Sequence, residues 1–453
     1  MATASLERVI RSRRVVTPRG IEPASIVLAG GHIAEVAAYR GDDYPCPVDD
    51  VGDAVVMPGL VDTHVHVNEP GRTEWEGYAS ATHAAAAGGI TTLVDMPLNS
   101  IPATTTRQAL DAKRAQASGQ CFVDVAFWGG VVPGNRDRLE ELIAAGVMGF
   151  KCFLCDSGVA EFAAVGESDL RAALPILAEA GVPLLAHAEL PAPLEAAARA
   201  AQDRDPRRYA TYLASRPPEA EEQAIALLVS LCRDTRAPIH IVHHSAASAL
   251  PILAAARDDG LPITAETCPH YLHFAAEDIP DGATEFKCAP PIRSADNREH
   301  LWQALARGVL DMVVSDHSPC TAALKDRDTG DFSTAWGGVA SLQLTLPITW
   351  TGATHRGYDL SDLVRWMCQE PARLAGLGGQ KGAIAPGYQA DLVVWHPEAR
   401  CEVDGEALQH KNKVTPYHGE TLLGVVARTY LRGELIYDSG SHLGAPRGRF
   451  SSR

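Results

Sequence analysis

Six side chains that can bind metal ions stand at or near the ends of short apolar runs of this sequence. They are four histidines, one lysine and one aspartate: His64, His66, Lys151, His187, His243 and Asp316. A lone histidine at the end of a strand is ordinarily a hydrogen-bonded structural residue. Potential metal ligands at the ends of five different apolar runs are unexpected by chance. Their common position therefore indicates a metal centre.

Two of these histidines have the spacing of a strand motif. Side chains alternate along a β-strand, so residues two apart share a face. Both imidazoles of His64-Val-His66 can therefore point at one metal ion.

Lys151 stands inside the apolar segment Gly149-Phe-Lys-Cys-Phe-Leu, where a buried ammonium would be unfavourable and would repel metal cations. An ion pair, a Schiff base or carboxylation by carbon dioxide could each neutralise it. Carboxylation turns the amine into an anion with two oxygens that can bridge two metal ions. Only this third arrangement explains the four histidines and the aspartate, and it predicts N6-carboxylated Lys151.

The remaining histidines near these runs have other interpretations. His244 follows His243 and points to the opposite side of the strand, so we expect it not to bind metal. His240 and His317 are interpreted as structural residues or as supports for the ligands. His270 could line the mouth of the site, but we do not place it on a metal.

The apolar runs that precede the candidate ligands alternate with helix-like stretches. Eight runs are expected to be strands, and they begin at Leu60, Thr91, Phe122, Gly149, Val182, Pro238, Pro262 and Asp311. Eight strands alternating with helices predict an α/β protein with a closed (β/α)8 TIM-like barrel over residues 58–379. Such barrels carry their active sites at the C-terminal ends of the strands, so the six side chains would converge at one mouth. A doubly wound open sheet would normally carry a Gly-rich phosphate turn after its first strand, and this sequence has none there.

The two ends of the chain differ from this middle part. Residues 1–57 and 380–440 contain short apolar runs, such as Ala24-Ser-Ile-Val-Leu-Ala, separated by Gly, Asp and Pro. They predict one discontinuous β-sandwich domain built from both termini. Residues 441–453 are rich in Gly, Arg, Pro and Ser, and we expect a loose tail.

Composition excludes several classes of function. The chain of 453 residues exceeds the usual limit for one hydrophobic core, in keeping with two domains.

Its formal net charge of -16 offers no basic surface for phosphates, so we expect no nucleic-acid partner. No apolar stretch approaches about 18 residues, and the N-terminal sequence Met1-Ala-Thr-Ala-Ser-Leu-Glu lacks the order of a secretory signal. We therefore expect a cytoplasmic protein that does not associate with membranes.

The ten cysteines, spread from Cys46 to Cys401, indicate reduced thiols. Only Cys152 and Cys155 have a CxxC spacing, and no second ligand pair matches them. We interpret them as ordinary thiols without chemistry.

Together these motifs resemble those of the cyclic amidohydrolases, the family of dihydroorotases, dihydropyrimidinases or hydantoinases, and allantoinases. The likeness rests on the strand lysine, on the two later single histidines, and on the segments Pro58-Gly-Leu-Val-Asp-Thr-His-Val-His and Val314-Ser-Asp-His-Ser-Pro. It covers nearly the whole chain. Longer segments resemble the allantoinase branch in particular: Asn68-Glu-Pro-Gly-Arg-Thr-Glu-Trp-Glu-Gly-Tyr, Asp95-Met-Pro-Leu-Asn, Glu266-Thr-Cys-Pro-His-Tyr, Lys287-Cys-Ala-Pro-Pro-Ile-Arg and Ala335-Trp-Gly-Gly.

Two departures separate the sequence from the other branches. Dihydroorotases typically carry an arginine two residues after the HxH motif, where this chain has Asn68. Hydantoinases usually carry a tyrosine a few residues after the lysine, where this chain reads Phe153-Leu-Cys155-Asp. A hydantoinase or dihydropyrimidinase stays open as the alternative. A non-catalytic scaffold on the same fold is the remote one, because such proteins lose metal ligands and this chain retains all six.

The resemblance implies an enzyme that hydrolyses (S)-allantoin to allantoate in purine degradation. It implies two divalent metal ions, zinc in the first place, although such ligands also accept manganese, cobalt or iron. The first ion would be bound by His64, His66 and Asp316, the second by His187 and His243, and carboxylated Lys151 would bridge them. A hydroxide between the ions would attack the amide.

The resemblance also implies roles around the metals. Asp316 would act as general base during attack and then as general acid toward the leaving nitrogen. Substrate contacts are expected from Asn99, Ser318 and the backbone near Ala289. Relatives suggest a homotetramer that takes a small-molecule substrate.

Overall fold

The computed structural model describes residues 5–41 and 44–453. The first four residues of the N-terminal stretch discussed above lie outside this described part.

Eight parallel strand positions form a closed barrel. In chain order they are β6 (Leu60–Val65), β7 (Ile90–Asp95), β8 (Asp124–Phe127) continued by β9 (Gly129–Gly130), β10 (Phe150–Phe153), β11 (Leu184–His187), β12 (Ile239–Ile241), β13 (Ile263–Thr267) and β14 (Met312–Val313). The strands pair in this order around the ring. The ring closes where Val65 pairs with His317 and the His66 amide donates to the His317 carbonyl at 2.9 Å. The predicted barrel is thus confirmed.

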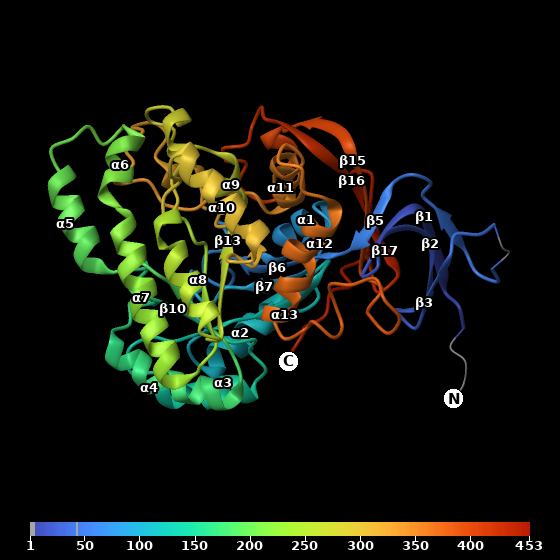
Figure 1. The fold of residues 1–453 in the computed structure, drawn as a ribbon, viewed down its shortest axis with the longest axis horizontal. Helices are drawn as coiled ribbons and strands as arrows, with labels where there is room; N and C mark the ends of the chain where they lie inside the picture. Colours follow the sequence, from blue (N-terminus) through green and yellow to red (C-terminus); the bar gives the residue numbers. More distant parts are fainter. Residues whose placement is uncertain (1–4, 42–43) are drawn as a thin grey trace.

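Helices cover the outside of the barrel (Figure 1). They are α1 (Tyr78–Ala87), α2 (Arg107–Ala117), α3 (Leu139–Ala144), α4 (Glu167–Ala180), α7 (Pro218–Thr235), α8 (Leu250–Asp258), α9 (Pro269–His273), α10 (Ala295–Arg307), α11 (Thr345–Thr354), α12 (Leu360–Val364) and α13 (Glu370–Leu374). In α4 the buried residues Leu170, Ala173, Leu174 and Leu177 recur at helical spacing and form one apolar face. An insertion after β11 adds α5 (Pro191–Ala201) and α6 (Tyr209–Ser215), at the far left of Figure 1.

Both ends of the chain form a β-domain beside the barrel (Figure 1). Its strands are β1 (Arg8–Thr17), β2 (Gly20–Ala29), β3 (His32–Ala38), β4 (Val48–Asp50), β5 (Val55–Pro58), β15 (Leu392–Glu402), β16 (Thr421–Leu431), β17 (Glu434–Asp438) and β18 (Ser441–His442). They form one sheet in the order β18-β17-β16-β15-β5-β1-β2-β3, with β4 on β1. Ile33 of β3 and Tyr430 of β16 share one buried cluster, so the sheet curls around a core. The exact limits of this domain, 1–57 with 380–440, stay a prediction.

The expectation of a loose tail over residues 441–453 is wrong. Gly448 donates its amide to the Cys121 carbonyl, and Val125 of β8 exchanges backbone hydrogen bonds with Arg449 and Ser451 at 3.0 Å. The tail thus pairs with the barrel in the manner of a short strand. A composition typical of loose segments did not reveal this pairing, because the partner lies more than 300 residues earlier in the chain.

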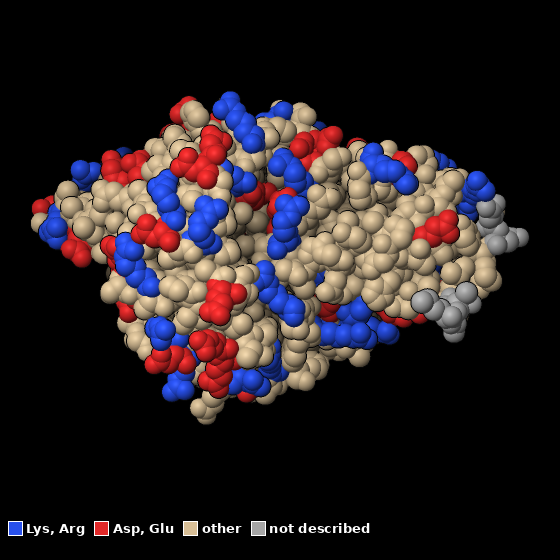
Figure 2. Space-filling model, turned by 60° about the horizontal axis from the view of Figure 1, so that its bottom comes forward, with Lys and Arg blue, Asp and Glu red and all other residues tan. Residues whose placement is uncertain are grey.

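Basic and acidic side chains lie interspersed over the face shown in Figure 2. Among the described residues, every helix is too short or too polar to span a bilayer.

A buried ion cluster joins the barrel to the β-domain. Lys381 donates to Asp124, at the start of β8, at 2.9 Å and to Asp391 at 2.5 Å. Arg432 also donates to Asp124, at 2.6 and 2.7 Å. The side chains of Lys381 and the two aspartates are 2 to 4% exposed, so these charges depend on one another for stabilisation.

Removing the shared cation of this cluster is expected to destabilise the fold. In Lys381→Met, Asp391 loses its cation and Asp124 keeps only Arg432, so we expect a loss of about 3 kcal/mol. The midpoint of urea unfolding, followed by circular dichroism, measures the effect. The double variant Lys381→Met/Asp391→Asn should recover part of the loss, and a single variant as stable as the wild type would contradict the prediction.

The same cluster predicts how the stability of the fold changes at acidic pH. Burial raises the pKa of Asp124, but Lys381 and Arg432 outweigh it, and the net pKa lies below the ordinary 3.8. A carboxyl group whose pKa is lowered by folding contributes stability above its unfolded pKa, and the contribution disappears as the pH falls through the folded value. The wild type should therefore lose this stabilisation below about pH 4, and the Lys381→Met variant should be less sensitive to that change.

Candidate metal centre at the mouth of the barrel

One cavity of about 880 Å³ opens at the C-terminal ends of the barrel strands. All nine residues proposed from the sequence line it: His64, His66, Asn99, Lys151, His187, His243, Ala289, Asp316 and Ser318. Residues up to 254 positions apart therefore meet in one place, as the barrel topology requires.

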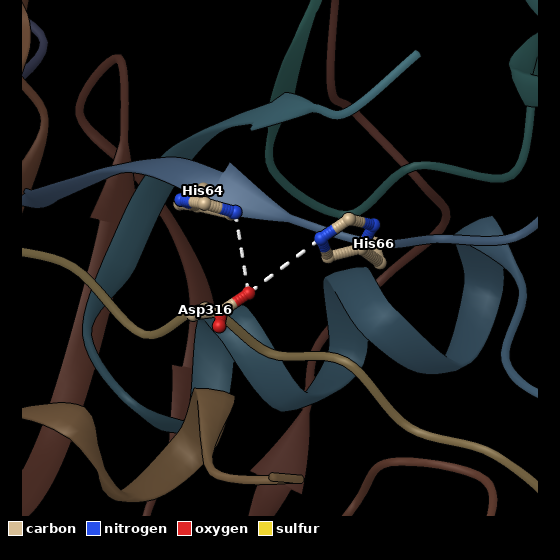
Figure 3. A group of neighbouring side chains, drawn as sticks. All are labelled: His64, His66 and Asp316. Atoms are coloured by element: carbon tan, nitrogen blue, oxygen red, sulfur yellow. Dashed lines mark ion pairs between the residues drawn. The ribbon is translucent and has the colours of Figure 1, made fainter. Parts of the chain in front are cut away.

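The first group of candidate ligands comes from β6 and from the segment after β14. His64 and His66 both point toward Asp316 (Figure 3). The Nε2 atoms of the two histidines lie 3.2 and 3.5 Å from Asp316 Oδ1. Burial raises the pKa of Asp316, but His64 and His66 outweigh it and lower the net value, so the group is an anion. Two imidazoles and one carboxylate at these separations form a ligand set for a divalent cation.

The second group continues the first around the mouth. His187 Nδ1 lies 3.1 Å from His243 Nε2, and the ring of His243 is 5.3 Å from that of His64. His243 Nδ1 has no hydrogen-bond partner among the described residues. The four imidazoles are therefore contiguous around one rim of the barrel.

Lys151 is fully buried beside these rings. Its Nζ has no hydrogen-bond partner in the described part of the chain, and it lies 5.0 Å from the centroid of the Phe153 ring. Burial lowers the pKa of Lys151 to about 8, against the influence of Glu266 and Asp316. A buried amine without a hydrogen-bond partner is unfavourable. Carboxylation of Lys151 would remove its positive charge and is compatible with this buried environment.

The backbone directs the strand-end ligands into the mouth. His243 and Asp316 adopt φ angles of 39° and 44°, and Asn99 adopts 67°. Residues other than glycine rarely occupy this left-handed region, and they do so mainly where the surrounding structure imposes it, often at functional sites. Asn99 Nδ2 also lies 3.4 Å from His66 Nδ1, so it contacts a candidate ligand directly.

Two buried glutamates that the sequence analysis did not assign orient the histidines. Glu266 on β13 bonds His64 Nδ1 at 2.5 Å and His240 Nε2 at 2.9 Å. Glu189 bonds His187 Nε2 at 2.7 Å and is itself paired with Arg216. Each carboxylate occupies one ring nitrogen and leaves the other facing the cavity. The spacing His187-Ala-Glu189 was a signal, since residues two apart share a face.

Loss of one such carboxylate should weaken metal binding. Glu266→Gln keeps the shape of the side chain but removes the charge that orients His64, and we expect metal affinity to fall roughly 10- to 100-fold. Metal retained during titration with a chelator measures this. Glu221→Gln is the matched control, because Glu221 is also buried but bonds Arg293 and the amides of Ser245 and Ala246, and no side chain of a candidate ligand. Equal metal retention in both variants would refute the role of Glu266.

His240 and His317 have the supporting positions that were predicted for them. His240 supports Glu266, and His317 bonds Glu76 at 3.1 Å and accepts from the Ser341 amide. His244 does not line the cavity. His270 does not line it either, although a ring nitrogen lies within 4.8 Å of Asp316.

Cys155 lies nearer to the site than the sequence indicated. It lines the cavity, and its sulfur lies within 4.8 Å of ligand atoms of His187 and Glu189. Since Glu189 is already paired with Arg216, we do not regard this trio as a metal site. Cys152 is fully buried and does not line the cavity.

The residues at the mouth therefore fit a binuclear metal centre. The donor set is the mixture of imidazoles and carboxylate that divalent transition metals accept. Among the six candidate ligands, Lys151 Nζ and His243 Nδ1 are buried without a hydrogen-bond partner in the described part of the chain.

Comparison with known proteins agrees with this class of site. The amidohydrolase family profile matches residues 55–436, and the chain belongs to the amidohydrolase family. Within it, an allantoinase from Streptomyces avermitilis is 51% identical over 99% of this chain and 99% of its own length. An allantoinase from Arabidopsis thaliana is 46% identical over 96% of this chain and 88% of its own length. Among solved structures, the L-hydantoinase (dihydropyrimidinase) from Arthrobacter aurescens matches with a TM-score of 0.94 and 30% identity, over 99% of this chain and 100% of that chain.

Proposed function

We propose that this protein is an allantoinase, which hydrolyses the cyclic amide of (S)-allantoin to allantoate in purine degradation. The observation that carries the proposal is the convergence of six candidate ligands on one cavity. The 51% identity with an allantoinase over nearly the full length supports the choice of substrate. A non-catalytic scaffold would have no need of this ligand set.

The proposed ligands divide into two groups around the mouth. One cation would be held by His64, His66 and Asp316, the other by His187 and His243, and carboxylated Lys151 would hold both. Two bound divalent cations would lower the pKa of a water molecule and polarise the amide carbonyl. We propose zinc, and metal analysis of the purified protein distinguishes it from manganese, cobalt and iron.

The proton transfers are assigned to Asp316. Its carboxylate takes a proton from the water that attacks the ring carbonyl carbon, and it returns that proton to the ring nitrogen as the carbon–nitrogen bond breaks. The anionic state of Asp316 in this surrounding suits the first of these steps. Asn99, Ser318 and the backbone of Ala289 are the proposed substrate contacts, since they line the same cavity.

A hydantoinase is the second candidate function, because the L-hydantoinase structure matches this fold with a TM-score of 0.94. Steady-state assays of the metal-loaded protein with allantoin, hydantoin, dihydrouracil and dihydroorotate distinguish the two. We expect the highest kcat/KM for allantoin. A preference for any of the other three substrates would refute the proposal.

We also propose a homotetramer, as the family resemblance implies, and a cytoplasmic location, as expected from the sequence. Analytical ultracentrifugation of the purified protein tests the assembly, and a monomer would refute it.

A further inference from the structure

Two lysines hold one wall of the cavity by donating to backbone carbonyls. Lys325 donates to the carbonyls of Trp336 and Gly338. Lys287 donates to the carbonyl of Ala335 at 2.5 Å and reaches that of Ser333 at 3.4 Å. All four carbonyls belong to residues 333–338, which we call the wall segment.

The two lysines differ in what they face. Lys325 is buried and does not line the cavity, whereas Lys287 lines it. The Lys287 ammonium also lies 5.4 Å from the centroid of the Tyr212 ring. An ammonium has three N–H donors, and the two carbonyls of the wall segment account for two of them. One donor of Lys287 is therefore left for a ligand in the cavity.

No carboxylate of the described chain lies within ion-pair distance of Lys287, unlike the neighbouring Arg216, which is paired with Glu189. Burial, together with the nearby charges of Lys325 and Arg216, lowers the pKa of Lys287 to about 8, while Asp331 opposes this shift. The protein thus places a cation in the substrate cavity without neutralising it. An oxygen acceptor on a bound ligand would stabilise that cation.

The contacts of Lys287 do not involve the metal centre. Its polar contacts are with the wall segment and the ring of Tyr212 on α6, and none is with a candidate metal ligand. A substrate whose ring amide lies at the metals would have room to present the group attached to its ring to this wall, which lines the same cavity. In allantoin that group is a ureido chain, which ends in a carbonyl and an amide.

We propose that Lys287 determines specificity by donating a hydrogen bond to the carbonyl oxygen of the ureido substituent. This inference rests on the proposed function. Lys287 would then favour hydantoin rings whose substituent carries an oxygen acceptor over hydantoin rings without a substituent. Lys325, in contrast, only supports the wall segment.

The test compares a substrate with the substituent and a ligand without it. Lys287→Met keeps the apolar stem and removes the donor, so kcat/KM for allantoin should fall about 10- to 100-fold. The inhibition constant of hydantoin, used as a competitor for the same site, should change less than about twofold, because hydantoin lacks the ureido group. Lys287→Arg, which retains a donor, should recover part of the loss.

Lys325→Met is the matched control. It loosens the same wall segment without removing a donor from the cavity, so it should affect allantoin and hydantoin alike. If Lys287→Met also shifts both ligands equally, or shifts neither, the proposal is overturned. Lys287→Leu, which also lacks a donor, serves as a second variant if the methionine variant folds poorly, and its circular dichroism spectrum checks its fold. A wild type that does not hydrolyse allantoin would refute the proposed function instead, whatever the variants show.

Discussion

Lys151→Ala is expected to lower kcat/KM for allantoin by roughly 10³-fold or more, since activation of water and carbonyl by bound metal contributes several kcal/mol. The substitution removes the anion proposed to hold both cations. It should therefore also lower the metal content from about two ions per chain, which elemental analysis measures independently of activity.

Short carboxylic acids provide a stringent check of this role. The cavity left by the lysine side chain gives formate, acetate or propionate access to the position of the missing carboxylate. We expect these acids to restore part of both the metal content and the activity. Full activity in the untreated variant would refute a bridging role for Lys151.

Lys113→Ala is a matched control for the loss of a buried lysine. Lys113 is also almost completely buried, but it is paired with Asp95 at 2.8 Å and donates to the Met96 carbonyl. Its removal should destabilise the fold and leave the metal content of the folded protein unchanged. Rescue of Lys113→Ala by the same acids would show that the effect is not specific to the metal centre.

Asp316→Asn is expected to lower kcat by roughly 10²- to 10⁴-fold, the range that proton transfer by a positioned side chain contributes. The amide has the shape of the carboxylate but cannot accept the proton of the attacking water. Single-turnover kinetics on protein loaded with metal to the wild-type level measures the chemical step apart from metal loss.

Asp156→Asn is the control for this variant. Asp156 also lines the cavity, but it is exposed, and among the described residues its carboxylate accepts a hydrogen bond from the Gly158 amide alone. Its replacement should change kcat less than about threefold, because surface substitutions away from the chemistry have small effects. Comparable rates for Asp316→Asn and Asp156→Asn would exclude Asp316 as the proton carrier.

The periodic features of this protein could be predicted from its sequence. The alternation of apolar runs with helical stretches gave the eight strands, and the HxH spacing gave the shared direction of His64 and His66. Both are local rules, because the side chains of a strand alternate whatever surrounds it. They were sufficient to gather the candidate ligands in one cavity.

Features set by distant contacts could not be predicted in this way. The left-handed backbone at His243 and Asp316 could not be predicted, because residues other than glycine adopt this region in only a few per cent of cases, even though Asp and His do so more often than most. Arg216 reaches Glu189 from the end of α6, in an insertion whose placement no periodicity fixes. The wall segment depends likewise on Lys325, which approaches it from outside the cavity.

Other features were within reach of the sequence. Glu266 lies near the C-terminal end of the seventh barrel strand, one residue before its last residue, Thr267. A search for carboxylates as well as histidines on the strands would have found it.

The two-part β-domain has a consequence for how the chain is made. β5 pairs with β15, with Pro58 opposite Leu392, so the first strands leave the ribosome about 330 residues before their partner. At ordinary rates of synthesis this interval lasts roughly 20 to 70 s. Throughout it the apolar face of β1 and β2 has no partner from the C-terminal strands. The nascent chain therefore offers a binding surface to ribosome-associated chaperones that the finished protein no longer presents.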